Sequence, residues 1–352
     1  MQKININGTD IGKNCPCYTI AEAGANHEGD IKKALNLIDA AKESGVNAIK
    51  FQNYTAAKLT TKTAPKYWDD GIKNESQFDV FDKLDKLSDD EWSQIFDYAR
   101  KKDITCFSTP FDMESVDLLE SLNVPAYKIA SADITHTPLV KKIAAKQKPI
   151  FMSTGMASMD EVHDAVSIIQ DEGNEEIIIM HCITSYPTKS EDANLDMIKS
   201  LDLEFPDYII GYSDHTLGTD IASYSVFYGS KCIEKHFTYD KNLSVSRDHR
   251  LSLNSDDFKE LIKKIKLIEM SRGSGVRDNF SAESSAVEFA RRSIVSKYDI
   301  PKGTEITENM IDIKRPGTGI LPKYFFKIIG SKTLKDIPED STIQWTDIDF
   351  NQ

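Results

Sequence analysis

Residues 18–52 read YTIAEAGANHEGDIKKALNLIDAAKESGVNAIKFQ and predict a strand, a helix and a second strand in that order. Residues 18–23 and 47–52 are short apolar runs of the kind found in buried parallel strands. Between them, residues 31–43 carry apolar side chains at helical spacing on one face, namely Ala34, Leu35, Ile38 and Ala41. Since parallel strands need a crossover connection, the stretch predicts one strand-helix unit of a parallel sheet.

The same alternation continues to about Met270 and decides the fold class. Eight strands are predicted, at residues 18–23, 47–52, 104–108, 126–131, 149–154, 176–182, 208–213 and 231–236. A plausible amphipathic helix follows each strand; in residues 256–269 its expected apolar face is Phe258, Leu261, Ile262, Ile265 and Leu267. Eight such units in about 250 residues predict an α/β protein with a (β/α)8 TIM barrel.

Three further segments complete the expected organisation of residues 1–270. The Asn7-Gly8 pair predicts a β-hairpin ahead of the first strand, and we expect this hairpin to cap the bottom of the barrel. The polar residues 53–89, with Tyr54, Tyr67 and Trp68, form a long stretch after the second strand. Loops of that length are usually functional or disordered, and this one is expected on the catalytic face.

Beyond Met270 the composition changes. Residues 271–287 are rich in Ser and Gly and are interpreted as a linker. Residues 288–352 predict a small β domain with strands at 293–296, 311–314 and 342–345 and no sizeable helix. About 65 residues is close to the lower limit for independent folding.

Composition excludes several functional classes. Of the 352 residues 40% are hydrophobic and 28% charged, as in ordinary globular proteins, and the net charge of −13 argues against nucleic acid as a partner. The five cysteines form no C-x-x-C pair, which favours a reducing compartment. Because no signal peptide or membrane-spanning run is evident, we expect a cytoplasmic protein with no membrane partner.

Polar residues gather at the carboxyl ends of the predicted strands, where a barrel of this type builds its active site. The set comprises Glu22, Asn26, His27, Lys50, Gln52, Ser108, Thr109, Lys128, Ser131, Asp133, Ser153, Thr154, His181, Thr184, Ser185, Tyr186, Ser213, Asp214, His215, Lys235 and His236. A purely hydrophobic core would not require these residue types.

Lys50 and Lys128 suggest an anion site, since a lysine is rarely buried without a negatively charged partner. Ringed by Ser and Thr hydroxyls, they make a credible cradle for phosphate and carboxylate groups. Either lysine alone could instead pair with a structural aspartate or reach past the strand end into solvent. The combination favours the anion site.

His215 and His236 end consecutive predicted strands and can face the same barrel mouth. Two neutral imidazoles, with oxygen ligands from substrate and water, suit a divalent first-row metal, although a single histidine there is more often structural. Glu22 precedes Gly24, where the backbone can approach a ligand, and is placed for acid-base chemistry. It could equally orient a histidine or pair with Lys50.

In this arrangement the chain resembles the sialic acid (N-acetylneuraminate) synthase family, which includes legionaminic and pseudaminic acid synthases. The resemblance rests on motifs in the same order: IAEAGANHEG (20–29), IKFQ (49–52), FSTPFD (107–112), YKIAS (127–131), STGM (153–156), HCITSYPT (181–188), GYSDHTLG (211–218), EKHFT (234–238) and KRPGTGI (314–320). It implies a TIM barrel followed by a small C-terminal antifreeze-like (SAF, β-clip) domain. It also implies a homodimer in which each SAF domain covers the partner's barrel.

The resemblance further implies condensation of phosphoenolpyruvate with an N-acylated amino sugar, such as N-acetylmannosamine or a 2,4-diacetamido-6-deoxyhexose, with release of phosphate. It assigns phosphoenolpyruvate binding to Lys50, Thr109, Lys128, Ser131, Ser153 and Ser213. Mn²⁺ or Mg²⁺ would bind His215 and His236, and Glu22 would be the catalytic carboxylate. Sugar contacts would come from Gln52, Asp133, Tyr186, Asp248 and, across the dimer, Arg315.

Three departures from the family pattern lie on the sugar side: Asp133 replaces the usual Glu, Thr184 replaces Asn, and residues 243–253 lack a Pro-Gly turn. The acceptor therefore stays open, and Arg247, His249 and Arg250 are candidates for a different sugar-reading surface. One alternative is a synthase of the Kdo or DAHP type acting on a phosphorylated aldose. A non-catalytic sugar-binding protein is the alternative from another class.

Overall fold

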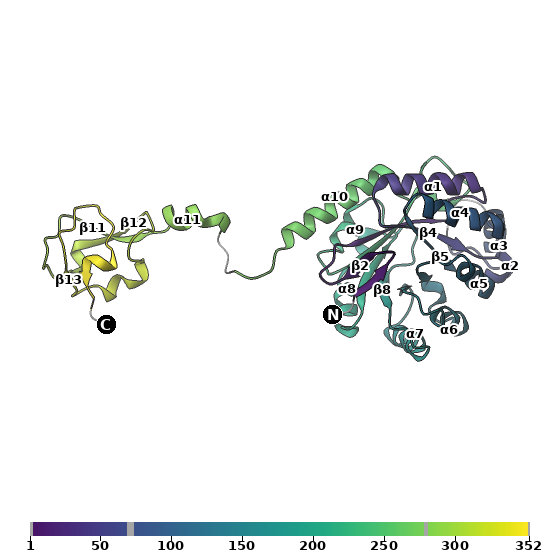
Figure 1. Ribbon diagram of the computed structural model, residues 1–352, viewed down its shortest axis with the longest axis horizontal. Coiled ribbons are helices and arrows are strands. Elements are labelled where there is room, and N and C mark those ends of the chain that lie inside the picture. The colour runs from purple at the N-terminus through teal and green to yellow at the C-terminus, as the bar shows by residue number, and fades with distance from the viewer. Residues whose placement is uncertain (1–2, 69–73, 278–280, 351–352) are drawn as a thin grey trace. The chain divides into compact units, whose positions relative to one another are not determined.

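The computed structural model describes residues 3–68, 74–277 and 281–350 of the chain. The chain divides into two compact units, Met1–Arg272 and Gly273–Gln352 (Figure 1). Each unit has a hydrophobic core of its own, and each is described separately below.

The first unit is a closed barrel of eight parallel strands, which confirms the predicted TIM-barrel fold. In barrel order after β10 (Cys232–His236) the strands are β3 (Tyr18–Gly24), β4 (Ala48–Asn53), β5 (Thr105–Pro110), β6 (Tyr127–Ile129), β7 (Ile150–Ser153), β8 (Ile177–Cys182) and β9 (Ile209–Asp214). All eight predicted strands are present, with ends displaced by one or two residues. The register aligns His236 with Glu22 and Glu22 with Lys50, so these side chains leave the barrel at similar heights.

Helices surround the barrel (Figure 1). They are α1 (Ile31–Ser44), α4 (Asp89–Lys101), α5 (Met113–Ser121), α6 (Thr137–Ala144), α7 (Met159–Asp171), α8 (Asp196–Glu204), α9 (Asp220–Tyr224) and α10 (Ser255–Arg272). Capping boxes at Ser88 and Ser158 satisfy the first N–H groups of α4 and α7. Within residues 3–68, 74–277 and 281–350, no helix is both long and apolar enough to cross a membrane.

One detail of the predicted apolar faces was wrong. On α10, Leu267 is 61% exposed, and Ile268 faces the barrel in its place. On α1, Leu35 is partly buried and packs against the core as predicted, and Leu37, which was not predicted, is fully buried. The buried stripe is thus displaced at its edge by one or two positions, because a 3.6-residue period leaves the edge of a helical face poorly defined.

The amino-terminal hairpin closes the bottom of the barrel, as predicted. Strands β1 (Lys3–Ile6) and β2 (Thr9–Gly12) pair around Asn7 and Gly8, both with positive φ, as a type I′ turn requires. Their isoleucines enter one buried cluster with residues from the lower ends of the barrel strands: Ile4, Ile6, Ile11, Tyr18, Ala48, Phe107, Phe151, Ile178 and Cys232. This end of the barrel interior is therefore apolar, and the buried charged side chains lie at the carboxyl ends of the strands.

The stretch after β4 is not one irregular loop, because it carries the helices α2 (Ala56–Leu59) and α3 (Gln77–Leu84). Aromatic contacts hold it together: Trp68 lies 6.1 Å from Phe81 and Tyr67 lies 4.8 Å from Trp68, between ring centroids. Residues 69–73 of the predicted loop lie outside the described residues.

The second unit is a small β domain with an isoleucine core: Ile294, Ile300, Ile306, Ile311, Ile320, Ile328, Ile337, Ile343 and Ile348. Strands β11 (Ser293–Ser296) and β12 (Ile311–Lys314) pair antiparallel, as do β13 (Lys332–Thr333) and β14 (Ile348–Asp349). The predicted strand at 342–345 was wrong, since only Thr342 forms a bridge, to Val295, before a 3-10 turn at Trp345–Asp347. The short helix α11 (Ser284–Phe289) overlaps the end of the predicted linker.

Candidate active site

A buried cluster of four charged groups lies at the carboxyl ends of β3, β4, β6 and β10. Lys50 Nζ is 2.7 Å from Glu22 Oε2 and 3.7 Å from Glu234 Oε2, and Lys128 Nζ is 3.2 Å from Glu234 Oε1. All four side chains are at most 7% exposed. The positive charges of the two ammonium groups equal the negative charges of the two carboxylates. The two lysines predicted from the sequence therefore lie in one site at this end of the barrel.

Glu234 joins the two lysines and was missed in the sequence. Its Oε1 accepts hydrogen bonds from Lys128 and from Ser213 Oγ at 3.1 Å. The available signal was its place on the last strand, two residues before His236, in a run that ends in charged side chains. The period of two along a strand does not say which set of alternate side chains points into the barrel, so it does not distinguish Glu234 from Lys235.

The two carboxylates of the cluster have opposite electrostatic environments. Burial raises the pKa of Glu22 to about 7, and Lys50 only partly offsets this effect. Burial also acts on Glu234, but Lys128 and Lys50 together lower its pKa to about 2. A proton that enters the cluster therefore goes to Glu22, whose Oε1 already accepts a hydrogen bond from Gln52 Nε2 at 2.8 Å.

Hydroxyl groups surround the lysines, as predicted from the strand ends. Thr109 Oγ1 accepts from Lys50 Nζ at 2.8 Å, and Ser153 Oγ accepts from Lys128 Nζ at 2.6 Å. Ser131 Oγ accepts from the backbone N of Gly155 at 3.0 Å. A Cβ on Gly155 would lie 2.9 Å from that oxygen, so only glycine fits at this position without displacing the Ser131 hydroxyl.

His215 and His236 face each other across β9 and β10, with ring centroids 5.4 Å apart. The Nδ1 atom of His215 contacts the carbonyl oxygen of Ile183 at 2.8 Å, which places a proton on Nδ1. Burial acts to lower the pKa of His215, but the adjacent Cys182 and the Ile183 carbonyl outweigh it and raise this pKa. Burial lowers the pKa of His236 to about 4, so this imidazole is neutral at pH 7. Neutral imidazoles are the form that binds metals.

These residues fit a divalent cation with an open coordination sphere. His236 Nδ1 is buried without a hydrogen-bond partner in the part of the chain that the structure describes, and Asp248 Oδ2 lies 3.8 Å away. No cluster of three or more His, Cys, Asp or Glu ligands occurs among residues 3–68, 74–277 and 281–350. A cation bound here would have the two imidazoles as its protein ligands, and substrate and water oxygens would complete its shell.

Two of the residues expected to contact the sugar, Tyr186 and Asp248, lie beside the histidines. The ring of Tyr186 is 4.2 Å from that of His215, and Asp248 faces His236. Asp133 Oδ2 is buried and lacks a hydrogen-bond partner among the described residues, and burial raises the pKa of this carboxyl to about 6. Arg315 is exposed and belongs to the second unit.

Several other candidates are structural. Lys235 pairs with Asp214 at 2.7 Å, and both are fully buried one residue before His236 and His215, respectively. The predicted surface role of His249 was wrong, because its ring is buried between Thr238 and Glu28. His181 binds the carbonyl of Ala193 at 2.8 Å.

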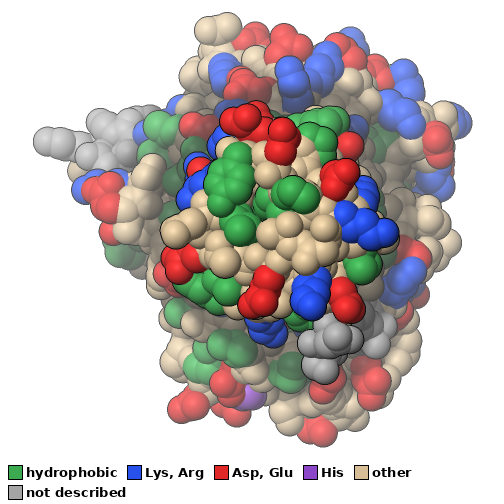
Figure 2. All heavy atoms as spheres, turned by 90° about the vertical axis from the view of Figure 1, so that its left-hand side faces the viewer, with side chains coloured by type: hydrophobic (Ala, Val, Ile, Leu, Met, Phe, Trp, Pro, Cys, Tyr) green, Lys and Arg blue, Asp and Glu red, His purple; other side chains and the backbone are tan. Residues whose placement is uncertain are grey.

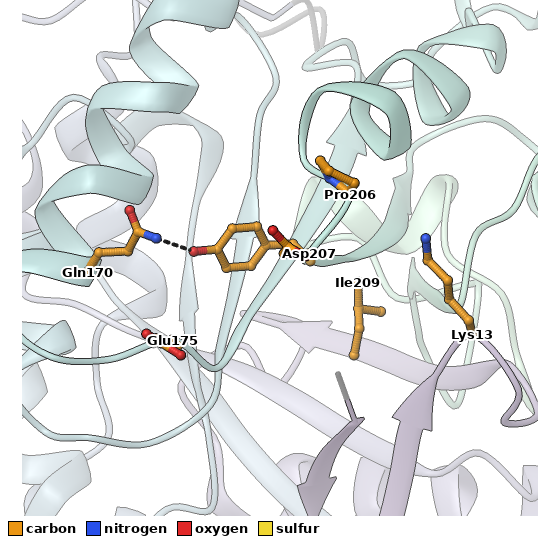
Figure 3. Close-up of a pocket in the computed structure, with 7 residues that line it drawn as sticks. Lys13, Gln170, Glu175, Pro206, Asp207 and Ile209 are labelled. Atoms are coloured by element: carbon orange, nitrogen blue, oxygen red, sulfur yellow. Dashed lines mark hydrogen bonds between the residues drawn. The ribbon is translucent and has the colours of Figure 1, made fainter. Parts of the chain in front are cut away.

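A separate pocket of about 460 Å³ lies at the opposite end of the barrel (Figure 3). It is lined by Lys13 after the hairpin and by Asp207, Tyr208 and Ile209 at the start of β9, and Gln170 donates to the Tyr208 hydroxyl at 2.7 Å. It adjoins none of the strand-end residues described above. In barrels of this type that end supports stability, and the active site is at the other.

Comparison with known proteins identifies relatives along the whole chain. The NeuB family model matches residues 37–277, and the SAF domain model matches residues 291–349, which confirms the antifreeze-like domain. The N,N'-diacetyllegionaminic acid synthase of Campylobacter jejuni is 38% identical over 92% of this chain and 98% of its own. The pseudaminic acid synthase of Helicobacter pylori is 36% identical over 95% and 98%, respectively.

A relative named for a phosphorylated product is also similar. The N-acetylneuraminate-9-phosphate synthase of Mus musculus is 33% identical over 96% of this chain and 94% of its own. Among solved structures, the N-acetylneuraminic acid synthetase of Leptospira borgpetersenii, in complex with citrate, superposes with a TM-score of 0.72. It is 32% identical, over 81% of this chain and 95% of its own.

Proposed function

The chain belongs to the NeuB family, and from this membership we propose that it is a nonulosonic acid synthase condensing phosphoenolpyruvate with an N-acylated amino sugar. Its relatives are named as synthases of sialic, legionaminic and pseudaminic acids. The product class is therefore a nine-carbon 2-keto sugar acid. A cytoplasmic location stays a prediction.

The observation that carries the proposal is the pair of buried lysines held by two carboxylates. Two ammonium groups, each also bonded to a hydroxyl, match the phosphate and carboxylate of phosphoenolpyruvate. The two lysines and two glutamates of the cluster have no net charge, so binding of a polyanion would favour the uptake of a proton by the cluster. Glu22 is the group that accepts it, because its pKa is raised to about 7.

In the proposed reaction, C3 of phosphoenolpyruvate forms a bond to the aldehyde carbon of the sugar, and a water oxygen adds to C2. The tetrahedral intermediate then loses phosphate by cleavage of its C2–O bond and gives the keto acid. Lys50 and Lys128 would hold the phosphate and carboxylate oxygens throughout. Glu22, in its protonated form, would supply a proton to the nascent alcohol or, ionised, would take one from the water.

His215 and His236 would hold Mn²⁺ or Mg²⁺ beside this cradle. When bound, the cation supplies Lewis-acid polarisation of the sugar aldehyde. The buried Lys235–Asp214 pair aligns β9 with β10 one residue before each histidine and would set the spacing of the imidazoles. Tyr186, packed on His215, forms the neighbouring wall.

We further propose that the chain acts as a homodimer in which the SAF domain of one protomer covers the barrel of its partner. Figure 2 shows hydrophobic side chains on the visible face of the small unit, interspersed with charged ones. Two large hydrophobic side chains of this unit are exposed, Phe326 at 76% and Trp345 at 42%, and the proposed dimer could cover them. Arg315, exposed on the same unit, would then reach the acyl-amino group of the sugar.

The test is phosphate release by the full-length protein with phosphoenolpyruvate, Mn²⁺ or Mg²⁺, and a panel of acceptors. N-acetylmannosamine and 2,4-diacetamido-2,4,6-trideoxymannose should release phosphate, and the 2-keto acid should appear in equal amount. Turnover only with arabinose 5-phosphate or erythrose 4-phosphate would instead support the Kdo or DAHP type. Lack of turnover with every acceptor, in metal-loaded protein that binds the sugars, would favour a non-catalytic binding protein.

A further inference from the structure

Arg247 lies in an aromatic enclosure beside the candidate active site. Its guanidinium carbon is 3.6 Å from the ring centroid of Trp68, 5.3 Å from that of Tyr186 and 5.6 Å from that of Tyr67. The first distance is that of direct stacking, in which the planar guanidinium covers the indole face. The side chain is only 16% exposed.

The enclosure adjoins the histidine pair through one shared residue. Tyr186 contacts Arg247 and also His215, and its ring lies 6.1 Å from that of His236. An open-chain hexose with its aldehyde carbon at the histidines can therefore reach Arg247 with a substituent farther along its carbon chain. The guanidinium is positioned to contact the acceptor sugar and lies apart from the lysine cradle.

The segment that carries Arg247 is firmly held. Glu28 Oε1 accepts from the backbone N of Val245 at 2.9 Å and of Ser246 at 3.2 Å, and it contacts His249 Nε2 at 3.2 Å. Glu28 itself has a positive φ of 52° and is paired with Lys33. The guanidinium is thus preorganised, and little conformational entropy would be lost when it binds a ligand.

The charge of Arg247 is already balanced, but its hydrogen-bonding capacity is not filled. Its Nε lies 3.5 Å from Asp248 Oδ1. Its Nη1 is buried and has no hydrogen-bond partner among the residues that the structure describes. A buried donor without a partner is costly, and here it points to a missing acceptor. Because the aromatic walls are uncharged and the carboxylate is adjacent, a neutral oxygen fits better than a dianion.

We propose that Arg247 is a specificity residue that donates a hydrogen bond to the carbonyl of a second N-acyl group on the acceptor sugar. The acyl methyl group would pack against Trp68 and Tyr67, and the sugar class would be a 2,4-diacylamino hexose. This inference rests on the proposed function and refines it, since Arg315 is the candidate contact for the first acyl group. A phosphorylated acceptor is the main alternative.

The experiment compares kcat/KM for 2,4-diacetamido-2,4,6-trideoxymannose, N-acetylmannosamine and N-acetylmannosamine 6-phosphate in the full-length, Mn²⁺-loaded protein. Arg247→Met removes every donor at similar length, and Arg247→Gln keeps a planar N–H donor without charge. Arg272→Met is the control, because Arg272 is an exposed arginine at the carboxyl end of α10 and is not among the candidate site residues. Thermal unfolding and the KM for phosphoenolpyruvate report whether each variant is folded with an intact cradle.

Arg247→Met should lower kcat/KM for the diacetamido sugar about 10- to 100-fold, the usual effect of losing a charge-assisted hydrogen bond. It should change the N-acetylmannosamine value less than about threefold, and Arg247→Gln should lose less than Arg247→Met. Equal losses of kcat/KM for both sugars, or the largest loss for the 6-phosphate, would overturn the role of Arg247 but would leave the proposed function standing. Wild-type protein inactive with every N-acyl sugar would overturn the proposed function as well.

Discussion

Replacing Glu234 with glutamine removes the carboxylate that lies between the two lysines while keeping the shape of the side chain. In the wild-type protein Glu234 accepts from Lys128 and Ser213 and lies 3.7 Å from Lys50. Lys50 retains Glu22 at 2.7 Å in the variant, but Lys128 retains only the hydroxyl of Ser153. The variant should therefore bury one ammonium group without a counter-charge.

The size of the effect follows from that loss. Removing one partner of a buried ion pair typically costs about 3–5 kcal/mol. Because Lys50 keeps its own partner, we expect the lower end, about 3 kcal/mol. For a domain of this size, that corresponds to a fall of roughly 6–12 °C in the melting temperature of the barrel.

Thermal unfolding with and without phosphoenolpyruvate tests the reasoning. A bound polyanion would replace the missing carboxylate, so at equal concentration it should raise the melting temperature of Glu234→Gln more than that of wild type. Glu43→Gln is the control, because Glu43 pairs with Lys259 at 2.7 Å on the surface and should change the melting temperature little. Equal melting temperatures for both variants, or an equal rise with ligand, would refute the counter-charge role.

Three other predictions address the rest of the site. The dissociation constant of phosphoenolpyruvate, measured by calorimetry, should be nearly constant just below pH 7 and should rise up to tenfold per pH unit above it. The reason is that the pKa of Glu22 is raised to about 7, so above this pH Glu22 loses the proton that balances the charge of the ligand. Glu22→Gln should remove this pH dependence. His215→Ala and His236→Ala should each lower Mn²⁺ affinity at least 100-fold, as followed by the electron paramagnetic resonance of free Mn²⁺, and affinities within threefold of wild type would count against the metal site. Arg315→Ala should raise the KM for the sugar about tenfold without changing that for phosphoenolpyruvate, whereas equal rises would show that the residue is misplaced.

The sequence was sufficient for the barrel and for most of its mouth because both depend on local, repeated patterns. Strand ends are marked by the change from apolar to polar residues, so the sequence alone assigns Lys50, Lys128, His215 and His236 to one end of the barrel. Each strand end was correct within about two residues, and the side chains alternate along a strand with a period of two. The predicted lysine and histidine pairs followed from these two regularities.

Glu234 and Arg247 could not be predicted in this way, because their environments are created by segments distant in sequence. Strand β10 offers Glu234, Lys235 and His236 in succession, and only closure of the barrel decides that Glu234 meets Lys128 while Lys235 turns to Asp214. Arg247 lies in a polar segment with no helical or strand period, and its role depends on Trp68, 179 positions earlier. The lysine cradle is thus encoded in the repeated barrel units, whereas the wall that would select the acceptor comes from the connections that follow two of the barrel strands, which can change without loss of the fold. Differences in acceptor among members of the family should accordingly be sought in residues 53–89 and 243–253, and less in the strand ends.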